Sequence, residues 1–297
     1  MISPGDFIRT NSKSLLSLHQ QINRMIYFPN TKINIGLFVT EKRKDGFHNL
    51  ETVFYPLGLS DILEVKRIED GVEGTCLFEN TGILVDCPVE KNLVLKAYHL
   101  LAKDFRLPAV KVRLRKIVPF GAGLGGGSSD AAFMLKALNE GCELGLSENK
   151  LMEYASQLGS DCAFFILNRP AFASGKGEQL EEITLSLNDY RLVLVKPDCG
   201  VSTAEAYRGI VPAPIEFDLR KIGTLPVEEW KQVVKNDFEA VVFARYPEIG
   251  NLKEYLYEQG AVYAAMTGSG SAVFGLFPKN GEEISIDCPG CFVWKEE

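Results

Sequence analysis

A glycine-rich loop at residues 119–130 carries the clearest chemical signal in this sequence. It reads Pro-Phe-Gly-Ala-Gly-Leu-Gly-Gly-Gly-Ser-Ser-Asp, and its glycines let the backbone approach a ligand with its N–H groups turned inward. A helix is predicted from about Ser128 to Leu138, and its start adds unpaired N–H groups and the positive end of its dipole. Ser128 and Ser129 add hydroxyls there. Together these features predict a binding site for a polyphosphate.

Three familiar glycine-loop signatures differ from this one. A Walker A motif needs Gly-Lys-Ser/Thr, and this loop contains no lysine. Gly121, Gly123 and Gly126 satisfy the GxGxxG spacing. A dinucleotide fold, however, places the next acidic residue at the end of a second strand, whereas Glu143 falls in a connector between two predicted helices. The His-Arg-Asp and Asp-Phe-Gly strings of protein kinases do not occur in the sequence.

The apolar patterning predicts the elements that must position this loop. Period-two alternation indicates strands, helical spacing indicates helices, Asn92 and Ser147 are predicted N-caps, and Gly159 is predicted to end a helix. Strands are predicted at 25–40, 50–66, 111–115, 192–196, 261–265 and 271–277, and helices after Asn92, from Ser128, after Ser147, at 227–243 and at 247–259. This mixture predicts an α+β fold.

Composition limits the possible roles of the chain. A net charge of −7 argues against coating nucleic acid, because no domain-wide positive field is present. No segment approaches the roughly 18 consecutive apolar residues of a membrane span. Of the seven cysteines, Cys288 and Cys291 form a lone CxxC pair without further zinc ligands or a redox context. We therefore expect reduced, structural cysteines in a cytoplasmic protein.

The first residues have a different character from the rest of the chain. Residues 1–24 lack the basic start, apolar stretch and cleavage site of a secretory signal. We predict that they form a poorly ordered extension, with Met25 a candidate natural start. A first lobe is predicted at 25–175 and a second at 176–297.

The loop resembles the phosphate loop of the GHMP kinase family, Pro-x-x-x-Gly-Leu-Gly-Ser-Ser-Ala-Ala, with one extra glycine and with Asp130 in place of the usual residue. A second segment, Met266-Thr267-Gly268-Ser269-Gly270-Ser271-Ala272, resembles the family's C-terminal glycine motif. The two motifs occur in the family's order. The resemblance implies two α+β lobes with the active site in the cleft between them.

Further motifs are similar to the branch of this family that phosphorylates the 2-hydroxyl of a cytidine-diphosphate-linked methylerythritol in non-mevalonate isoprenoid synthesis. They are Pro29-Asn30-Thr31-Lys32-Ile33-Asn34, Arg43-Lys44-Asp45-Gly46-Phe47-His48, Gly159-Ser160-Asp161, Ser174-Gly175-Lys176-Gly177-Glu178 and Gly200-Val201-Ser202-Thr203. The resemblance runs from about residue 25 to 277. It departs from the branch's pattern at Asn30-Thr31, and at Phe47, where the branch has tyrosine and its hydroxyl.

The resemblance implies ATP and Mg²⁺ as cofactors and a small-molecule alcohol as substrate, with no nucleic-acid or membrane partner. Asp161 is implied as the base that takes the hydroxyl proton, and Lys32 as the cation that neutralises developing charge. The implied ATP contacts are Asn92, Lys116, Pro119, Gly121, Ala122, Gly123, Leu124, Gly125, Gly126, Gly127, Ser128 and Ser129. The sequence does not assign the ligands of the Mg²⁺ ion, and Ser129 is one candidate.

On the substrate side, the resemblance implies that Asn34 contacts the methylerythritol end. Phe47 and Tyr207 are expected to sandwich the cytosine, and His48 to hydrogen-bond its edge. Thr203 and Gly268 complete the implied substrate contacts. Two alternatives stay open: another GHMP kinase acting on homoserine, mevalonate or a sugar, and a non-catalytic nucleotide-binding regulator. The oligomeric state is also open.

Overall fold

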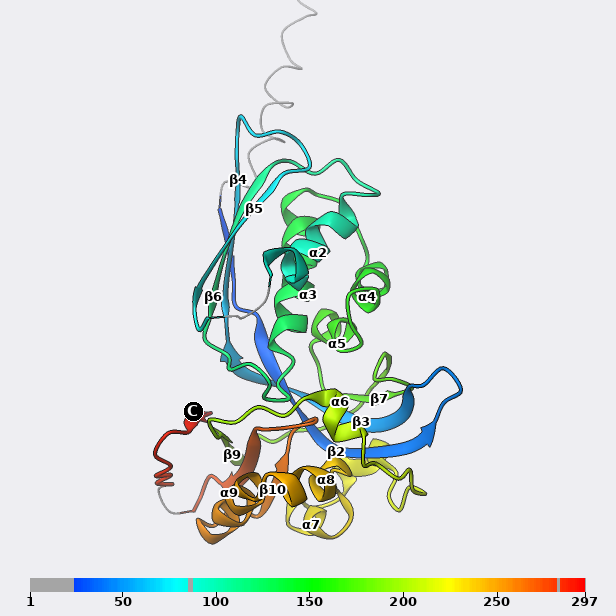
Figure 1. The fold of residues 1–297 in the computed structure, drawn as a ribbon, viewed down its shortest axis with the longest axis vertical. Coiled ribbons are helices and arrows are strands. Elements are labelled where there is room, and N and C mark those ends of the chain that lie inside the picture. The colour runs from blue at the N-terminus through cyan, green and yellow to red at the C-terminus, as the bar shows by residue number, and fades with distance from the viewer. Residues whose placement is uncertain (1–23, 85–87, 282–283, 297) are drawn as a thin grey trace, which may run out of the picture.

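The computed structural model describes residues 24–84, 88–281 and 284–296, within which helices accompany three four-stranded sheets (Figure 1). The predicted α+β class is confirmed. The extension predicted at 1–24 lies outside the described residues except for Arg24, whose guanidinium forms an ion pair with Glu64 at 2.8 Å. None of the helices in these ranges has the length and apolar character needed to cross a bilayer.

The first sheet, in the upper half of Figure 1, carries a layer of helices on one side. Its strand order is β1 (Met25–Tyr27), β4 (Ile62–Arg67), β6 (Val110–Lys116) and β5 (Cys76–Gly82). The helices are α2 (Leu93–Leu101), α3 (Gly126–Gly141), α4 (Glu148–Ser156) and α5 (Cys162–Leu167), and a 3-10 turn (Val89–Lys91) precedes α2. The two predicted N-caps are confirmed, since the side chain of Asn92 accepts a hydrogen bond from Val94 N and that of Ser147 accepts one from Lys150 N. The predicted end at Gly159 was wrong, because α4 ends at Ser156 with Gln157 as its C-cap.

The second sheet is dominated by a long hairpin that lies between the upper and lower halves of the molecule (Figure 1). It has the order β2 (Asn30–Lys42), β3 (His48–Ser60), β7 (Ala171–Ser174) and β8 (Gln179–Glu182). Every residue of β2 from Thr31 to Val39 is buried. Burial of consecutive residues means that both faces of the strand are covered, so the strand can deliver side chains to a site at the junction.

The third sheet, in the lower half, has the order β10 (Tyr263–Met266), β11 (Val273–Pro278), β9 (Tyr190–Lys196) and β12 (Phe292–Lys295). It packs with α6 (Thr203–Tyr207), α7 (Trp230–Val233), α8 (Phe238–Arg245) and α9 (Pro247–Glu258), and with 3-10 turns at Leu219–Thr224 and Val227–Glu229. The lobe boundary predicted at 175/176 falls in the turn between β7 and β8, which pair with each other. The division into lobes stays a prediction.

The helix predicted at 227–243 is broken, which corrects the sequence analysis. Residues 234–237 leave the helical path because their backbone pairs with β2 instead: Leu37 N donates to Lys235 O at 2.8 Å, and Asp237 N donates to Leu37 O at 2.9 Å. A long-range backbone pairing therefore replaces the local helical hydrogen bonds.

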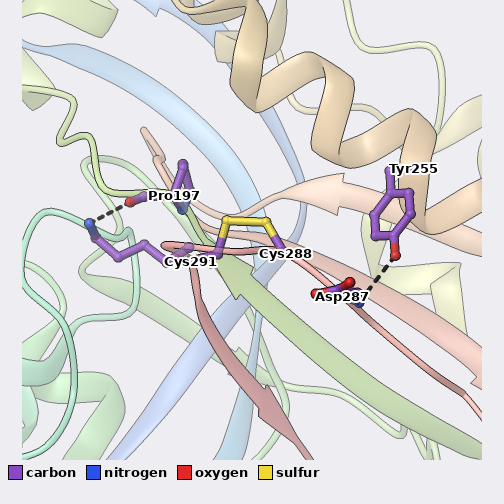
Figure 2. The surroundings of a disulfide bond; sticks show 6 residues. Pro197, Tyr255, Asp287, Cys288 and Cys291 are labelled. Atoms are coloured by element: carbon purple, nitrogen blue, oxygen red, sulfur yellow. Dashed lines mark hydrogen bonds between the residues drawn. A yellow bond between two sulfur atoms is a disulfide. The ribbon is translucent and has the colours of Figure 1, made fainter.

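Cys288 and Cys291 are joined as a disulfide, so the expectation of reduced cysteines was wrong for this pair (Figure 2). A turn in which Cys291 N donates to Cys288 O at 3.0 Å brings the two side chains together just before β12. The expectation is confirmed for Cys76, Cys142, Cys162 and Cys199, which are free thiols, and Cys87 lies outside the described residues. Within the described ranges, no three His, Cys, Asp or Glu side chains are grouped as metal ligands.

Candidate active site

A cavity of about 420 Å³ lies where the glycine loop, the β2–β3 hairpin and the turn at 266–270 meet. It brings together segments that are far apart in the sequence. The predicted site residues that line it are Lys32, Asn34, Lys116, Pro119, Gly121, Ala122, Gly123, Leu124, Gly125, Gly126, Gly127, Ser128, Asp161, Thr203, Tyr207 and Gly268. The polyphosphate cradle, the expected base and part of the expected substrate contacts therefore share one space.

The glycines of the loop serve two different purposes. Gly123 and Gly125 have φ values of +73° and +70°, and a Cβ at Gly123 would lie 2.0 Å from the carbonyl oxygen of Thr267. A Cβ at Gly125 would lie 2.9 Å from the ring of Phe165. At Gly127, by contrast, a Cβ would meet no atom within 4 Å beyond its chain neighbours and the backbone of its own helix. The first two glycines are thus required by packing, whereas Gly127 leaves open space at the helix start.

The start of α3 is an anion-binding position. The helix runs for 16 residues from Gly126, and its N-cap Gly125 makes no side-chain capping bond. Its first N–H groups and dipole can therefore act on a ligand in the cavity. The hydroxyl-bearing Ser128 lines the cavity, whereas Ser129 is completely buried and does not line it. The structure therefore does not bring the Ser129 side chain to the position expected for an ATP or metal contact.

Lys32 and Asp161 meet at the inner wall of the cavity, with 3.5 Å between Lys32 Nζ and Asp161 Oδ2. Lys32 projects from β2 and also donates to Asn34 Oδ1 at 2.5 Å and to Gly123 O at 3.0 Å. Asp161 is the N-cap of α5, but its carboxylate makes no capping bond. It is 30% exposed, whereas the lysine side chain is 4% exposed. The carboxylate can therefore receive a proton from a ligand in the cavity.

Burial governs the charge state of Lys32. Loss of solvent lowers the pKa of its ammonium, and the carboxylate of Asp161 opposes that shift. The ring of Phe54, 5.0 Å from Nζ, adds a cation–π contact. A partly desolvated ammonium beside a carboxylate is well placed to stabilise negative charge that develops in the cavity.

Lys116 also lines the cavity, but its ammonium is held by two carboxylates. Nζ forms ion pairs with Asp61 and with Asp130, the latter at 2.7 Å, and all three side chains are at most 4% exposed. Asp61 also accepts the N–H groups of Ile117 and Val118 at 2.6 and 2.9 Å. The cluster fixes the backbone that leads into the glycine loop. Lys116 was expected to contact ATP, but its partners in the structure are these two carboxylates.

The carboxyl of Asp130 is perturbed by this setting. Burial, together with the neighbouring Asp61, raises its pKa to about 7 against the opposing effect of Lys116.

Asn92, the other residue expected on the adenosine side, caps α2 and lines neither this cavity nor the one described next.

A second cavity of about 780 Å³ adjoins the first and contains the expected base-binding residues Phe47 and His48. The imidazole of His48 stacks on Tyr207 with 4.9 Å between ring centroids and 19° between planes. Phe47 is 58% exposed at the rim, with Lys176 Nζ 5.2 Å from its ring centroid. The ring stacked on Tyr207 is therefore that of His48, and the role of Phe47 in a sandwich stays a prediction.

Two residues that the sequence analysis did not select tie the site together. Thr267 Oγ1 accepts from Asn34 N at 2.9 Å and donates to Gly123 O at 3.1 Å, which joins β2, the glycine loop and the second motif. Asn236 Nδ2 donates to the carbonyls of Met266 and Gly268 at 2.7 and 2.8 Å. Thr267 stood inside a quoted motif and could have been named, whereas Asn236 lay in a segment predicted as an ordinary helix.

Comparison with known proteins agrees with this geometry. The family model for the GHMP kinases N terminal domain matches residues 92–169, and that for GHMP kinases C terminal matches residues 215–286. A 4-diphosphocytidyl-2-C-methyl-D-erythritol kinase of Parabacteroides distasonis is 53% identical over 273 residues, which cover 91% of this chain and 98% of that protein. The protein of the same name from Bacteroides fragilis is 52% identical over 92% of this chain and 99% of its own length.

Solved structures of kinases with similar folds also match this chain. A crystal structure of a 4-(cytidine 5'-diphospho)-2C-methyl-D-erythritol kinase superposes with a TM-score of 0.70 and 33% identity, covering 85% of this chain and 90% of that one. The Methanococcus jannaschii mevalonate kinase has a TM-score of 0.64 at 13% identity, covering 92% of this chain and 98% of its own, and so shares the fold alone. The segments matched by the two family models contribute the glycine loop, Asp161 and Gly268 to the first cavity, and the chain belongs to the GHMP kinase family.

Proposed function

We propose that this chain is an ATP-dependent kinase that transfers the γ-phosphoryl group of ATP to the 2-hydroxyl of 4-diphosphocytidyl-2-C-methyl-D-erythritol, giving ADP and the 2-phosphate in non-mevalonate isoprenoid precursor synthesis. The observation that carries the proposal is the adjacency of two cavities. One holds the α3 N-terminus and the Lys32–Asp161 pair, and the other holds His48 and Tyr207. A nucleotide-linked alcohol that reaches from one to the other fits this arrangement.

ATP lies with its phosphates against the glycine loop and the first turn of α3. The N–H groups there supply hydrogen bonds to the phosphate oxygens without a lysine in the loop. Phosphoryl transfer needs mainly positioning and charge stabilisation from a protein. The loop and the helix start supply both, and this assignment is supported by the open space at Gly127.

Asp161 takes the proton of the attacking hydroxyl, and Lys32 stabilises the charge on the transferring group. Support comes from their 3.5 Å separation, from the exposure of 30% of the Asp161 side chain, which makes no capping bond to α5, and from the position of both residues in the cavity wall. A non-catalytic nucleotide-binding regulator has no use for this pair.

Mg²⁺ accompanies ATP in this proposal. The ion takes oxygen ligands, keeps several waters, and commonly binds phosphates with one or two protein groups. The hydroxyl of Ser128 lines the cavity beside the glycine loop and fits this role, whereas the carboxylate of Asp161 is kept for the proton of the substrate. The ion would neutralise phosphate charge. The sparse protein ligand set is consistent with an ion held chiefly by its nucleotide.

The cytidine moiety occupies the second cavity, where His48 and Tyr207 offer a stacked pair of rings beside Phe47. Binding energy from this remote group orients the reacting hydroxyl.

A turnover assay tests the whole proposal, with ATP and a panel of alcohols: the cytidylated substrate, methylerythritol phosphate without cytidine, homoserine, mevalonate and a hexose.

We expect a far higher kcat/KM for the cytidylated alcohol than for any other member of the panel. His48→Ala should reduce the ratio of kcat/KM for the cytidylated alcohol to kcat/KM for the other alcohols, because it removes a ring stacked on Tyr207 and the proposed hydrogen bond to the edge of the cytosine. Equal kcat/KM with and without cytidine would contradict the proposal and favour a kinase acting on one of the other alcohols.

A further inference from the structure

Two cavities meet at four residues, and the chemistry of those residues bears on the proposed substrate. Ser160, Lys176, Thr203 and Tyr207 line both the catalytic cavity and the cavity of His48. A cytidine-linked alcohol with its base in one cavity and its hydroxyl in the other must place its diphosphate beside this shared wall. Two phosphate charges at that point need a counter-charge or hydrogen-bond donors.

Lys176 is the cation of the shared wall. Three lysines line the two cavities in the part of the chain that the structure describes, and two of them are already committed to carboxylates. Lys32 is paired with Asp161, and Lys116 is paired with Asp61 and Asp130. The ammonium of Lys176 instead lies over the ring of Phe47. A phosphate can recruit it without breaking an ion pair within the described structure.

The backbone holds Lys176 at this point. It sits at the tip of the turn between β7 and β8, between Gly175 and Gly177, whose φ values are +70° and +103°. Its N–H donates to Glu178 Oε2 at 2.6 Å, and Gly177 N donates to Ser174 O at 3.0 Å. The carbonyl of Gly175 accepts from Leu50 N on β3 at 2.8 Å. The turn is therefore tied to the sheet, and the lysine side chain projects from a backbone held by these hydrogen bonds.

We propose that Lys176 binds the diphosphate of the cytidine-linked substrate and so distinguishes a nucleoside diphosphate conjugate from an uncharged nucleoside. The inference rests on the proposed function, whose substrate it specifies further. The lysine is a specificity-determining residue and takes no part in proton transfer. Its ammonium also lies 5.2 Å from the ring centroid of Phe47, in the segment that carries His48.

The test uses binding of CDP and of cytidine, measured by titration calorimetry with wild type, Lys176→Met and Lys176→Arg. A charge-assisted hydrogen bond lost from one partner corresponds to an affinity loss of roughly 10- to 100-fold. We expect that loss for CDP in Lys176→Met, no change for cytidine, and near-normal CDP binding in Lys176→Arg. High salt should reduce the difference between the proteins, because the contact is partly exposed.

Lys44→Met is the matched control, since Lys44 is exposed in the turn beside Phe47 and lines neither cavity. It should leave CDP affinity unchanged. Equal losses for CDP and cytidine in Lys176→Met would show that the lysine only supports the ring of Phe47, and would overturn the inference. If Lys176→Met binds CDP as tightly as wild type does, while wild type turns over the cytidylated alcohol, the inference alone is overturned. A wild type that binds ATP but neither CDP nor cytidine would overturn the proposed function as well.

Discussion

Two lysine–carboxylate clusters lie on either side of the glycine loop, and they differ in how closed they are. The pair Lys32–Asp161 is 3.5 Å apart, and its carboxylate is 30% exposed to the cavity. The cluster of Lys116 with Asp61 and Asp130 is at most 4% exposed throughout, and its Asp61 is saturated by backbone N–H groups. The same residue types therefore serve a loose, accessible pair and a closed, structural one.

The difference teaches that the environment of a lysine–carboxylate pair decides its role. A closed cluster, in which a buried lysine is paired with two carboxylates and one of them also accepts two backbone N–H groups, holds the backbone in place. An open pair with spare hydrogen-bond capacity can exchange its proton with a ligand. Substitutions in one cluster should therefore change chemistry, and substitutions in the other should change stability.

The largest effect is expected at the open pair. Asp161→Asn keeps the shape of the side chain but cannot accept the proton, so kcat should fall by about 10²–10⁴ with little change in ATP affinity. Lys32→Met should lose a similar factor, and the double variant should be barely worse than either single variant because both act on the same transfer. Single-turnover phosphoryl transfer measures all four proteins, with circular dichroism to check folding. Strictly additive losses would show that the two residues act independently, and a near-normal rate for Asp161→Asn would place the base elsewhere.

The closed cluster should respond through stability instead. Asp61→Asn removes the charge that pairs with buried Lys116, and disturbs the bonds to two backbone N–H groups, so the free energy of unfolding should fall by about 3 kcal/mol. Urea denaturation measures this loss, and kcat of the folded fraction at saturating ATP should stay far above that of Asp161→Asn. A stable Asp61→Asn protein with a severely reduced kcat would break the distinction between the clusters.

The glycines between the clusters allow a sharper separation of packing from ligand binding. A Cβ at Gly125 would meet Phe165 and the Cε of Lys32, whereas a Cβ at Gly127 has open space beyond its own helix. Gly127→Val should therefore reduce ATP affinity by at least about tenfold while the free energy of unfolding is retained. Gly125→Val should lose both. Nucleotide titration with parallel denaturation measures the two quantities, and normal ATP affinity in Gly127→Val would contradict the cradle.

The smallest effect is expected at Asp130. Its folded pKa of about 7 lies above the ordinary value, so between about pH 4 and pH 7 the folded chain holds a proton that the unfolded chain has released. The raised pKa of Asp130 therefore adds to the free energy of unfolding at low pH, and this contribution is lost as pH rises toward 7. Asp130→Asn should flatten this part of the stability profile without changing kcat. The exposed Asp70→Asn is the matched control, and an unchanged slope in Asp130→Asn would contradict the assignment.

Much of the site could be predicted from the sequence because its signals are local. The glycine spacing, the helix that follows it, and the caps Asn92 and Ser147 each depend on residues within a few positions of one another. Lys32 and Asp161 were named through motifs, and the structure places them together in one cavity. Most predicted strands and helices are observed, but the strand predicted at 25–40 is divided into β1 and β2, which belong to different sheets.

The rest was decided by tertiary contacts, which sequence spacing does not encode. Lys116 meets Asp61 across 55 positions, so the sequence could not show that its ammonium is already occupied. The helix predicted at 227–243 breaks because β2 supplies backbone partners to residues 235–237. Ser128 and Ser129 are indistinguishable as neighbours in the sequence, yet the helix turns one toward the cavity and buries the other. Local chemistry therefore determined which residues could act, and the packing of distant segments decided which of them face the ligand, because burial and pairing depend on partners that only the folded chain brings near.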